Sequence, residues 1–327
     1  MTYQIVIIGA GQIGSRHLQA LSLIDRDITV SVFDPNKESL ELAKKRFEEL
    51  PENKFVRSVS YFEALDGLND DIDVAIIATN ADIRRQVIEQ LLQKVRVRFF
   101  ILEKMAFQSV EDFENIMALL EDKGSKAWVN CSYRRMFPFY QEMRKSFSAG
   151  EKIFLNLWGG GWGLASTSIH VLDLFLYLAG ETSIRLDGSR LDLSIGESKR
   201  EGFVEFTGML RGTTDNGSEI SLLDYQGSVA PFVIQIFSRD SRFVIFEFER
   251  KAICALKADN WKSKEVPFTF LRQSQLTHLV VQQILDTENC ALASIKEAFR
   301  LHKPMLKEFI DHLQNVTGKK YQKCPIT

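Results

Sequence analysis

Short apolar runs alternate with segments of helical periodicity over the first 125 residues of the chain. The apolar runs lie near residues 4–8, 28–33, 55–58, 73–79 and 99–102. The helical patterns lie near residues 14–24, 35–47, 61–66, 81–93 and 109–122. Strands that alternate with helices are typical of βαβ units around a parallel sheet. We therefore expect residues 1–125 to form one doubly wound α/β domain.

From about residue 150 the pattern changes to strands, several of them with alternating polar and apolar positions. These strands are predicted near residues 152–158, 203–206, 220–223, 232–238, 242–249 and 252–257. A hairpin signal, Asp215-Asn216-Gly217-Ser218, separates two of them. Helices are expected near residues 271–288 and 294–316. Residues 126–327 should thus form a second α/β domain with a large, mostly antiparallel open sheet, whose last helix can pack back on the first domain.

Three glycines mark the passage from the first strand to the first helix. Gly9, Gly11 and Gly14 form a GxGxxG motif in the strand–turn–helix context that binds dinucleotides. The first glycine permits the tight turn, the second lets a pyrophosphate approach the backbone, and the third allows close packing of helix and strand. The diphosphate would lie at the helix N-terminus, beside Gln12 and Ile13, where N–H groups and the helix dipole favour negative charge. The alternative is a packing turn without a ligand.

An acidic residue follows the second apolar run. Asp34 lies 20 residues beyond Gly14, where a carboxylate can accept hydrogen bonds from the adenosine ribose and repel a 2′-phosphate. Asp34 therefore favours NAD over NADP. Lys37 lies nearby and is able to accept a phosphate, so both cofactors remain open.

Two further strands end in polar residues. Glu103 and Lys104 end the run from Phe99 to Leu102 abruptly. Ligands of open α/β sheets bind at the carboxyl edge of the strands, so these two side chains are placed for chemistry, unless they only begin a solvated loop. Thr79 and Asn80 end the preceding strand. They either line the nicotinamide side of the cleft, or Asn80 caps the next helix.

Two candidate substrate contacts lie between the halves of the chain. Arg134 and Arg135 follow a predicted strand in a basic, aromatic turn. They either bind an anionic group of the substrate or are surface cations. The sequence leaves both possibilities open.

A helix is predicted to begin with a cap at Ser166 or Thr167 and to end at Gly180. His170 and Asp173 are three residues apart and share one face of it. Such a pair can supply a general acid and the group that orients it. It can equally be solvated or internally satisfied. With no third ligand at a suitable spacing, we expect no metal here.

The composition of the chain argues against several classes of partner. The net charge of −2, from 41 basic and 43 acidic residues, gives no global field that favours nucleic acid or an anionic membrane. The four cysteines have no CxxC spacing, so we expect reduced thiols in a cytoplasm rather than disulfides or zinc. The N-terminus lacks the pattern of a signal peptide, and no apolar stretch approaches the roughly 20 residues of a membrane span.

Together these features resemble the Gfo/Idh/MocA oxidoreductases, the glucose–fructose oxidoreductase and inositol dehydrogenase family, over nearly the whole chain. The resemblance rests on the glycine motif with Arg16-His17 after it, Ala78-Thr79-Asn80, Glu103-Lys104, Arg134 to Pro138, and His170-x-x-Asp173. It implies a Rossmann domain followed by an α/β domain whose open sheet often forms the interface of a homodimer or homotetramer. It also implies hydride transfer between NAD or NADP and a carbinol or ketone carbon of a sugar, cyclitol or sugar nucleotide.

The resemblance assigns roles to several residues. Lys104 would contact the reacting oxygen, His170 would assist proton transfer, and Glu103 would lie near the nicotinamide ribose. Two positions depart from the family pattern: Met105 stands where proline is usual, and Ser166 stands where dehydrogenases often carry aspartate. Ser166 either bonds substrate or caps its helix.

These departures keep two alternatives open. The family fold also includes a transcriptional repressor of a galactose pathway, so a non-catalytic dinucleotide-binding regulator is one of them. A bilin or imine reductase is the other.

Overall fold

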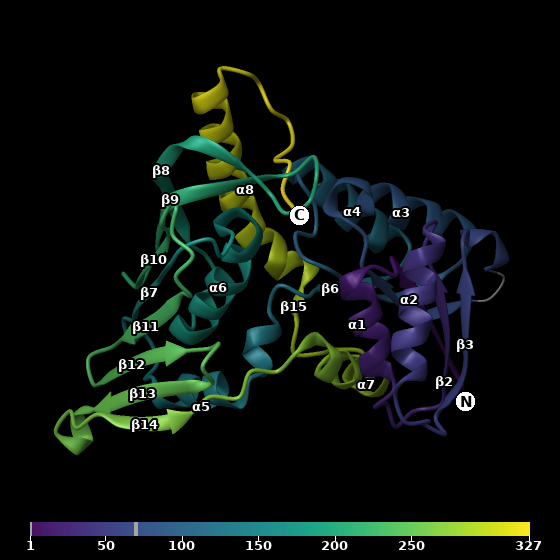
Figure 1. The fold of residues 1–327 in the computed structure, drawn as a ribbon, viewed down its shortest axis with the longest axis horizontal. Coiled ribbons are helices and arrows are strands. Elements are labelled where there is room, and N and C mark those ends of the chain that lie inside the picture. The colour runs from purple at the N-terminus through teal and green to yellow at the C-terminus, as the bar shows by residue number, and fades with distance from the viewer. Residues whose placement is uncertain (1, 69–70) are drawn as a thin grey trace. The chain divides into compact units, whose positions relative to one another are not determined.

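The computed structural model describes residues 2–68 and 71–327 of an α/β chain (Figure 1). The chain divides into two compact units. Unit 1 contains residues 1–107, 111–131 and 271–298, and unit 2 contains residues 108–110, 132–270 and 299–327. The predicted class, a parallel doubly wound sheet plus a second and mostly antiparallel sheet, is confirmed.

Unit 1 is built on a seven-stranded sheet with the order β15-β6-β5-β4-β1-β2-β3, parallel except at β15. Its strands are β1 (Tyr3–Ile8), β2 (Ile28–Phe33), β3 (Val56–Phe62), β4 (Ile72–Ile77), β5 (Val97–Leu102), β6 (Lys126–Val129) and β15 (Ala293–Ser294). Its helices are α1 (Gln12–Leu21), α2 (Lys37–Glu48), α3 (Ala81–Lys94), α4 (Val110–Asp122) and α7 (Thr277–Thr287).

The central strands of unit 1 are buried on both faces. Ile7, Ile76 and Phe100 are each 0% exposed, as the unbroken apolar runs require of a parallel sheet covered by helices. The chain moves one way from β1 to β3 and the other way from β4 to β6. With right-handed crossovers, α1 and α2 cover one face and α3 and α4 the other. The strand order therefore reverses between β1 and β4, where open α/β sheets bind ligands.

Two segments that the sequence assigned to the second domain lie in unit 1. Strand β6 begins at Lys126 and pairs with β5, so the sheet continues past the predicted boundary at 125/126. Residues 271–298 return to unit 1 from late in the chain, and β15 pairs there with β6. Both assignments depend on pairing between distant segments, which local patterns do not contain. Helix α8 (Ile295–Thr317) begins in unit 1 and continues into unit 2.

Unit 2 is built on an eight-stranded sheet with the order β14-β13-β12-β11-β7-β10-β9-β8, antiparallel except where β7 and β10 pair in parallel. The strands are β7 (Phe154–Gly159), β8 (Arg185–Glu197), β9 (Val204–Thr213), β10 (Glu219–Asp224), β11 (Val233–Phe237), β12 (Ser241–Phe246), β13 (Lys251–Leu256) and β14 (Lys264–Pro267). The hairpin predicted at 215–218 joins β9 and β10 and is confirmed.

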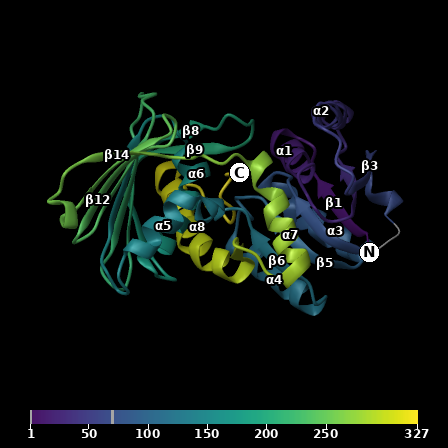
Figure 2. The same ribbon diagram turned by 90° about the horizontal axis from the view of Figure 1, so that it is seen from below.

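Helices cover one face of the unit 2 sheet. Figure 2 shows α5 (Pro138–Ser146), α6 (Leu164–Ala179) and α8 on the same side of it. Helix α6 is apolar almost all round and 13 of its 16 residues are buried, so it lies in the core of the unit. On the other face Phe154 and Trp158 of β7 are 43% and 46% exposed.

The start of α6 corrects a prediction. The helix begins at Leu164, two residues before the predicted cap. Glu205 on β9 accepts hydrogen bonds from the N–H groups of Ala165 and Ser166, at 2.9 and 3.2 Å, and so caps the helix from outside the segment. The predicted end is confirmed, because Gly180 has the left-handed conformation (φ 71°) of a C-terminal cap.

Candidate functional site

The glycine motif forms a tight strand–turn–helix joint in unit 1. Gly9 has φ +97°, and a Cβ there would lie 2.8 Å from the carbonyl carbon of Ala78. A Cβ at Gly14 would lie 1.8 Å from the carbonyl oxygen of Gly9. A Cβ at Gly11, by contrast, would meet no atom within 4 Å among the residues that the structure describes. The first and third glycines are thus required by packing, and the second leaves open space against the backbone.

A cavity of about 450 Å³ lies over this joint, at the point where the strand order reverses. Its volume is within the range of small-molecule and cofactor sites. It is lined by Ile8, Gly9, Gly11, Phe33, Asp34, Pro35, Glu63, Ala64, Leu65, Ala78, Thr79, Asn80, Ile83, Val87 and Gln90. The residues after β3 and those on α3 were not among the sequence predictions.

Two polar features of this cavity fit a dinucleotide. Helix α1 begins at Gln12 with no side-chain cap and no acidic residue in its first turn, so its N–H groups and dipole are available to an anion. The hydroxyl oxygen of Thr79 is buried without a hydrogen-bond partner among the residues that the structure describes. A buried hydroxyl without a partner is costly, and a ligand that bonds to it would remove that cost.

Asp34 is held at the edge of the cavity by backbone N–H groups. Its Oδ2 accepts from the N–H of Ala10 at 2.7 Å, and its Oδ1 accepts from the N–H of Asn36 at 2.8 Å. The two bonds fix the carboxylate between the glycine loop and the start of α2. A carboxylate has about four acceptor positions, so Asp34 keeps capacity for ribose hydroxyls.

Asn80 lies where β4 leads into α3. It occupies the N-cap position of α3, although its side chain makes no capping hydrogen bond there. It also lines the cavity beside Thr79. Lys104 is the second residue after β5 and is half-buried, while its neighbour Met105 is fully buried.

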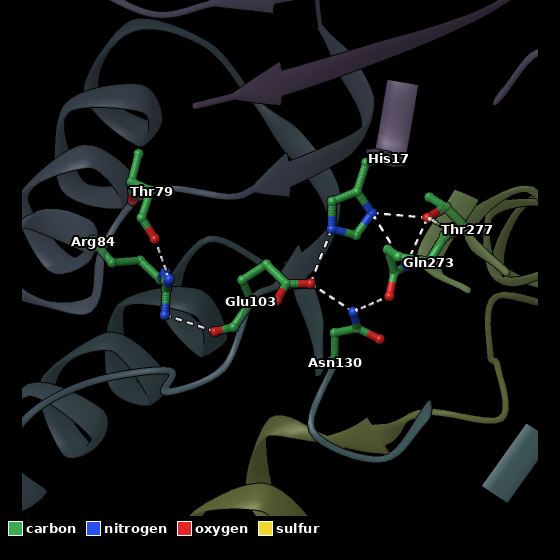
Figure 3. A network of polar contacts seen from close by, with 7 residues as sticks. All are labelled: His17, Thr79, Arg84, Glu103, Asn130, Gln273 and Thr277. Carbon is green, nitrogen blue, oxygen red and sulfur yellow. Dashed lines mark hydrogen bonds and ion pairs between the residues drawn. The ribbon is translucent and has the colours of Figure 1, made fainter. Parts of the chain in front are cut away.

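Glu103 is the centre of a buried polar network within unit 1 (Figure 3). Its Oε1 accepts from Nε2 of His17 at 2.9 Å and from Nδ2 of Asn130 at 2.5 Å. Asn130 also donates to Gln273 at 2.8 Å, and Nδ1 of His17 lies 2.8 Å from the hydroxyl of Thr277. Residues 271–298, which return to unit 1 late in the chain, therefore help to hold the Glu103 carboxylate at the end of β5.

These contacts keep Glu103 ionised. Burial alone would raise its pKa, but the hydrogen bond and charge of His17, the hydrogen bond from Asn130 and the charge of Arg84 together lower the pKa to about 2. The carboxylate is therefore an acceptor at neutral pH. Its Oε1 carries both bonds to His17 and Asn130, which leaves Oε2 for a ligand hydroxyl.

Replacement of Glu103 by Gln should make unfolding less sensitive to acid. The pKa of Glu103 falls from 4.5 to about 2 on folding, so the unfolded chain binds the proton more readily between these values. The stability that the carboxylate contributes is complete above pH 4.5 and is lost as the pH falls toward 2. Urea unfolding across this range measures the effect, with exposed Glu121→Gln as the control. An equal acid sensitivity in wild type and Glu103→Gln would contradict the assignment.

In unit 2, His170 and Asp173 are buried, with exposed fractions of 8% and 2%, so the solvated interpretation is wrong. Both oxygens of Asp173 accept from Arg135, at 2.8 Å from Nε and 2.5 Å from Nη2. The ring of His170 lies edge-to-face with Tyr133, with centroids 4.7 Å apart. Asp173 thus holds the turn Tyr133–Met136 against α6, next to His170.

Arg134 does not match either of its sequence interpretations. It is 3% exposed, so it is not a surface cation. Its Nε and Nη2 donate to the two carboxylate oxygens of Glu247, at 3.0 and 2.8 Å, so it is not presented to a substrate anion. Tyr140 donates to the same carboxylate at 2.8 Å. Burial disfavours the charge of Arg134, but Glu247 outweighs it and raises the pKa of Arg134 above its ordinary value.

Ser166 lies in the first turn of α6, where its hydroxyl is 3.4 Å from the carbonyl oxygen of Gly163. The glycine loop before it is held by a second carboxylate, since Asp224 accepts from the N–H groups of Gly161 and Gly163 at 2.6 and 2.9 Å. The structure thus places Ser166, His170, Asp173 and Arg134 in unit 2. Lys104 and the cofactor candidates lie in unit 1.

Several residues of these networks have no role predicted from the sequence. They are Arg84, Asn130, Gln273, Thr277 and Glu247, and His17 was noted only as part of a resemblance. For one of these residues the sequence does contain a signal of a buried polar contact. Arg84 lies three residues after Ala81 and four before Ile88, on the buried stripe of α3, where a charge demands a partner. The others depend on contacts between distant segments.

A protein-family model matches most of unit 1. The model described as "Oxidoreductase family, NAD-binding Rossmann fold" (GFO_IDH_MocA) matches residues 3–131. Residues 3–131 of the chain therefore match the Rossmann domain of that family. The match ends at the last residue of the second segment of unit 1, so the matched region includes β6.

Solved structures match the chain over nearly its full length. UDP-N-acetylglucosamine 3-dehydrogenase GnnA of Acidithiobacillus ferrooxidans is 16% identical, with a TM-score of 0.67 and coverage of 96% of both chains. A super-repressor mutant of Gal80p from Saccharomyces cerevisiae is 14% identical, with a TM-score of 0.71 and coverage of 96% of this chain and 97% of that one. Biliverdin reductase from Synechocystis, in complex with biliverdin and NADP+, is 11% identical, with a TM-score of 0.70 and coverage of 97% and 99%.

These identities are low, so the likeness shows the fold and leaves the substrate open. Among curated proteins none matches the chain. In the part of the chain that the structure describes, no helix is long and apolar enough to cross a membrane. Over the same residues no three His, Cys, Asp or Glu side chains gather as a metal site would require.

Proposed function

We propose that this protein is an NAD(P)-dependent oxidoreductase that transfers a hydride to or from a carbinol or ketone carbon of a sugar, cyclitol or sugar nucleotide. The observation that carries the proposal is the cavity over the glycine joint. It combines open space at Gly11, an uncapped helix N-terminus, a fixed carboxylate at Asp34 and the unpartnered hydroxyl of Thr79. A dinucleotide offers a complementary group to each of these features.

The residues of unit 1 would hold the cofactor. Its diphosphate is assigned to the N–H groups around Gly11, Gln12, Ile13 and Gly14, and its adenosine ribose to Asp34. Thr79 and Asn80, which line the cavity, are assigned to the nicotinamide side. Glu103 and Lys104, which follow the neighbouring strand β5, are assigned to the same side, where Glu103 can accept from a ribose hydroxyl through Oε2. When bound, the nicotinamide supplies or accepts the hydride.

Proton transfer is assigned to Lys104 and His170. Oxidation of an alcohol releases a proton as well as a hydride, so a positioned base must take it from the hydroxyl. Lys104 is half-buried at the carboxyl end of β5 and is the proposed acid/base group. His170 is proposed to assist, and Ser166 to contact the substrate. Asp173 is proposed to act indirectly, by holding Arg135 and the neighbouring turn beside His170.

A non-catalytic dinucleotide-binding regulator is the second candidate. Met105 and Ser166 depart from the pattern that the family's dehydrogenases share, and the fold of Gal80p is similar. Binding of NADH without turnover of any polyol, ketose or sugar nucleotide would favour it. Turnover of biliverdin alone would instead favour a bilin reductase.

The exposed face of the unit 2 sheet is the proposed interface of a homodimer or homotetramer. Phe154 and Trp158 offer half-exposed aromatic rings on β7, and a soluble monomer rarely leaves a large apolar patch uncovered. Light scattering that gave the mass of one chain at micromolar concentration would contradict this. We also infer a reducing compartment such as the cytoplasm, which fits the four free cysteines.

The cofactor is tested by binding and turnover together. Calorimetry should show tighter binding of NADH than of NADPH by wild type, because Asp34 repels a 2′-phosphate. In Asp34→Ala that preference should fall by about tenfold or more, since one charge pair near a surface is worth about 1.4 kcal/mol or more. Stopped-flow loss of NAD(P)H absorbance with keto-sugars and sugar nucleotides then tests the reaction. Failure of both nucleotides to bind would overturn the proposal, and Glu38→Ala is the control on the same segment.

A further inference from the structure

One fully buried cation of unit 1 belongs to none of the roles above. Arg84 on α3 is 1% exposed and is the largest of the fully buried side chains. The cost of burying a guanidinium is high unless its N–H groups are satisfied by hydrogen bonds or a charge. The contacts of Arg84 therefore indicate what the residue does.

Arg84 donates to backbone carbonyls on two loops. Its Nη1 donates to the carbonyl oxygens of Glu103 at 2.6 Å, Ala106 at 3.0 Å, and Met105. Its Nη2 donates to the carbonyl oxygen of Thr79. Figure 3 shows the guanidinium between the Thr79 and Glu103 backbones. One side chain thus connects the segments that follow β4 and β5.

The carbonyls that Arg84 binds lie on both sides of Lys104. Glu103 precedes the lysine and Met105 follows it, so the bonds hold the backbone at either flank of the proposed acid/base group. On the other side of the same turn, His17 and Asn130 hold the carboxylate of Glu103. The backbone of the turn is consequently held from α3, and the side chain of Glu103 is held from α1 and from the residue that follows β6. The planar guanidinium offers several donors in a fixed arrangement to two loops at once, which the single ammonium of a lysine reproduces only in part.

We propose that Arg84 is a positioning residue that fixes the Glu103–Ala106 turn against the end of β4, and so places Lys104 relative to the cofactor cavity. This inference rests on the proposed function for the role of Lys104. That Arg84 fixes the turn next to the cavity does not depend on the proposed function, because Thr79 lines the cavity and Arg84 connects Thr79 to the turn. Arg84 touches neither substrate nor reacting atoms in this scheme.

The test compares Arg84→Met, which removes the donors, with Arg84→Lys, which keeps the charge. Hydrogen exchange with mass spectrometry follows the amides of residues 103–107, calorimetry gives the Kd of NADH, and stopped-flow gives kcat and KM. Arg84→Met should exchange at 103–107 about tenfold faster, with the strands β1 and β4 unchanged. Its kcat should fall by about 100-fold while the Kd of NADH changes less than about threefold, because a small misplacement of a catalytic group costs that much rate. Arg84→Lys should recover part of the kcat.

Arg85→Met is the matched control. Arg85 is the neighbouring arginine of the same helix and makes its ion pairs with Glu89 and Asp112, away from the turn. Its variant should keep wild-type exchange at 103–107 and wild-type kcat. Wild-type kcat and exchange in Arg84→Met would overturn the proposal. So would slower turnover with unchanged exchange at 103–107, which would indicate a general structural role.

The two proposals can fail separately. If wild type turns over no substrate, the proposed reaction fails, yet exchange and NADH binding still decide the role of Arg84. Faster exchange confined to 103–107 with NADH binding retained would support it. Unchanged exchange there would contradict it. If Arg84→Met does not fold, Arg84→Lys carries the same comparison with a smaller expected change.

Discussion

Lys104→Met should lower kcat by about 1000-fold while NADH binds as in wild type. General acid–base groups contribute about 100- to 10,000-fold, and methionine removes the amine while it keeps most of the side-chain length. Lys104 is half-buried two residues after the end of β5, at the carboxyl edge where open α/β sheets bind ligands. Single-turnover stopped-flow on the best substrate of the panel, with calorimetry for NADH, measures the two quantities separately.

Lys94→Met is the control for this experiment. Lys94 lies at the far end of α3, where its amine pairs with Asp66 at 2.5 Å on the exposed surface. Its loss should leave kcat unchanged. Undiminished turnover in Lys104→Met would remove Lys104 from the mechanism. A loss of NADH binding equal to the loss in kcat would make it a binding residue only.

Glu247→Ala should reduce the free energy of unfolding by about 3 to 5 kcal/mol. That is the usual cost when one partner of a buried ion pair is removed, because the remaining charge has no compensation. Arg134 would keep its charge at 3% exposure, and Tyr140 would lose its acceptor. The two charged side chains are only 3% and 1% exposed, so water has little access to the pair. Urea unfolding of the variant gives the value.

A double variant distinguishes the loss of the ion-pair attraction from the cost of leaving one charge unpaired in the core. Arg134→Met with Glu247→Met should be less destabilised than Glu247→Ala, because no unpaired charge remains in the core. Arg239→Ala, which breaks the exposed pair with Asp240, should leave stability without measurable change. A Glu247→Ala variant as stable as wild type would show that the pair lies in water, contrary to its burial.

The dinucleotide-binding part of unit 1 could be predicted from the sequence because its motif and its strand patterns each lie within a short stretch of the chain. Gly9, Gly11 and Gly14 lie within six residues, and the geometry of one turn dictates the first and the third. Short apolar runs of four to seven residues identified the central strands, since a strand buried on both faces must be continuously apolar. The same rule explains what the patterns missed in unit 2. Strands β8 and β14 are the two edges of that sheet, and exposed edges need no apolar pattern.

The polar networks were decided by the tertiary structure alone. Glu247 lies 113 residues from Arg134, and Gln273 lies 143 residues from Asn130, so no spacing in the sequence connects them. The chain by itself determined a doubly wound dinucleotide fold and placed Glu103 and Lys104 at its carboxyl edge. Folding decided which arginine is buried against a carboxylate, which glutamate is held ionised, and that Arg84 joins the two loops beside Lys104. The reason is physical: a backbone conformation is a local property, whereas the partner of a buried charge is whatever the fold brings to it.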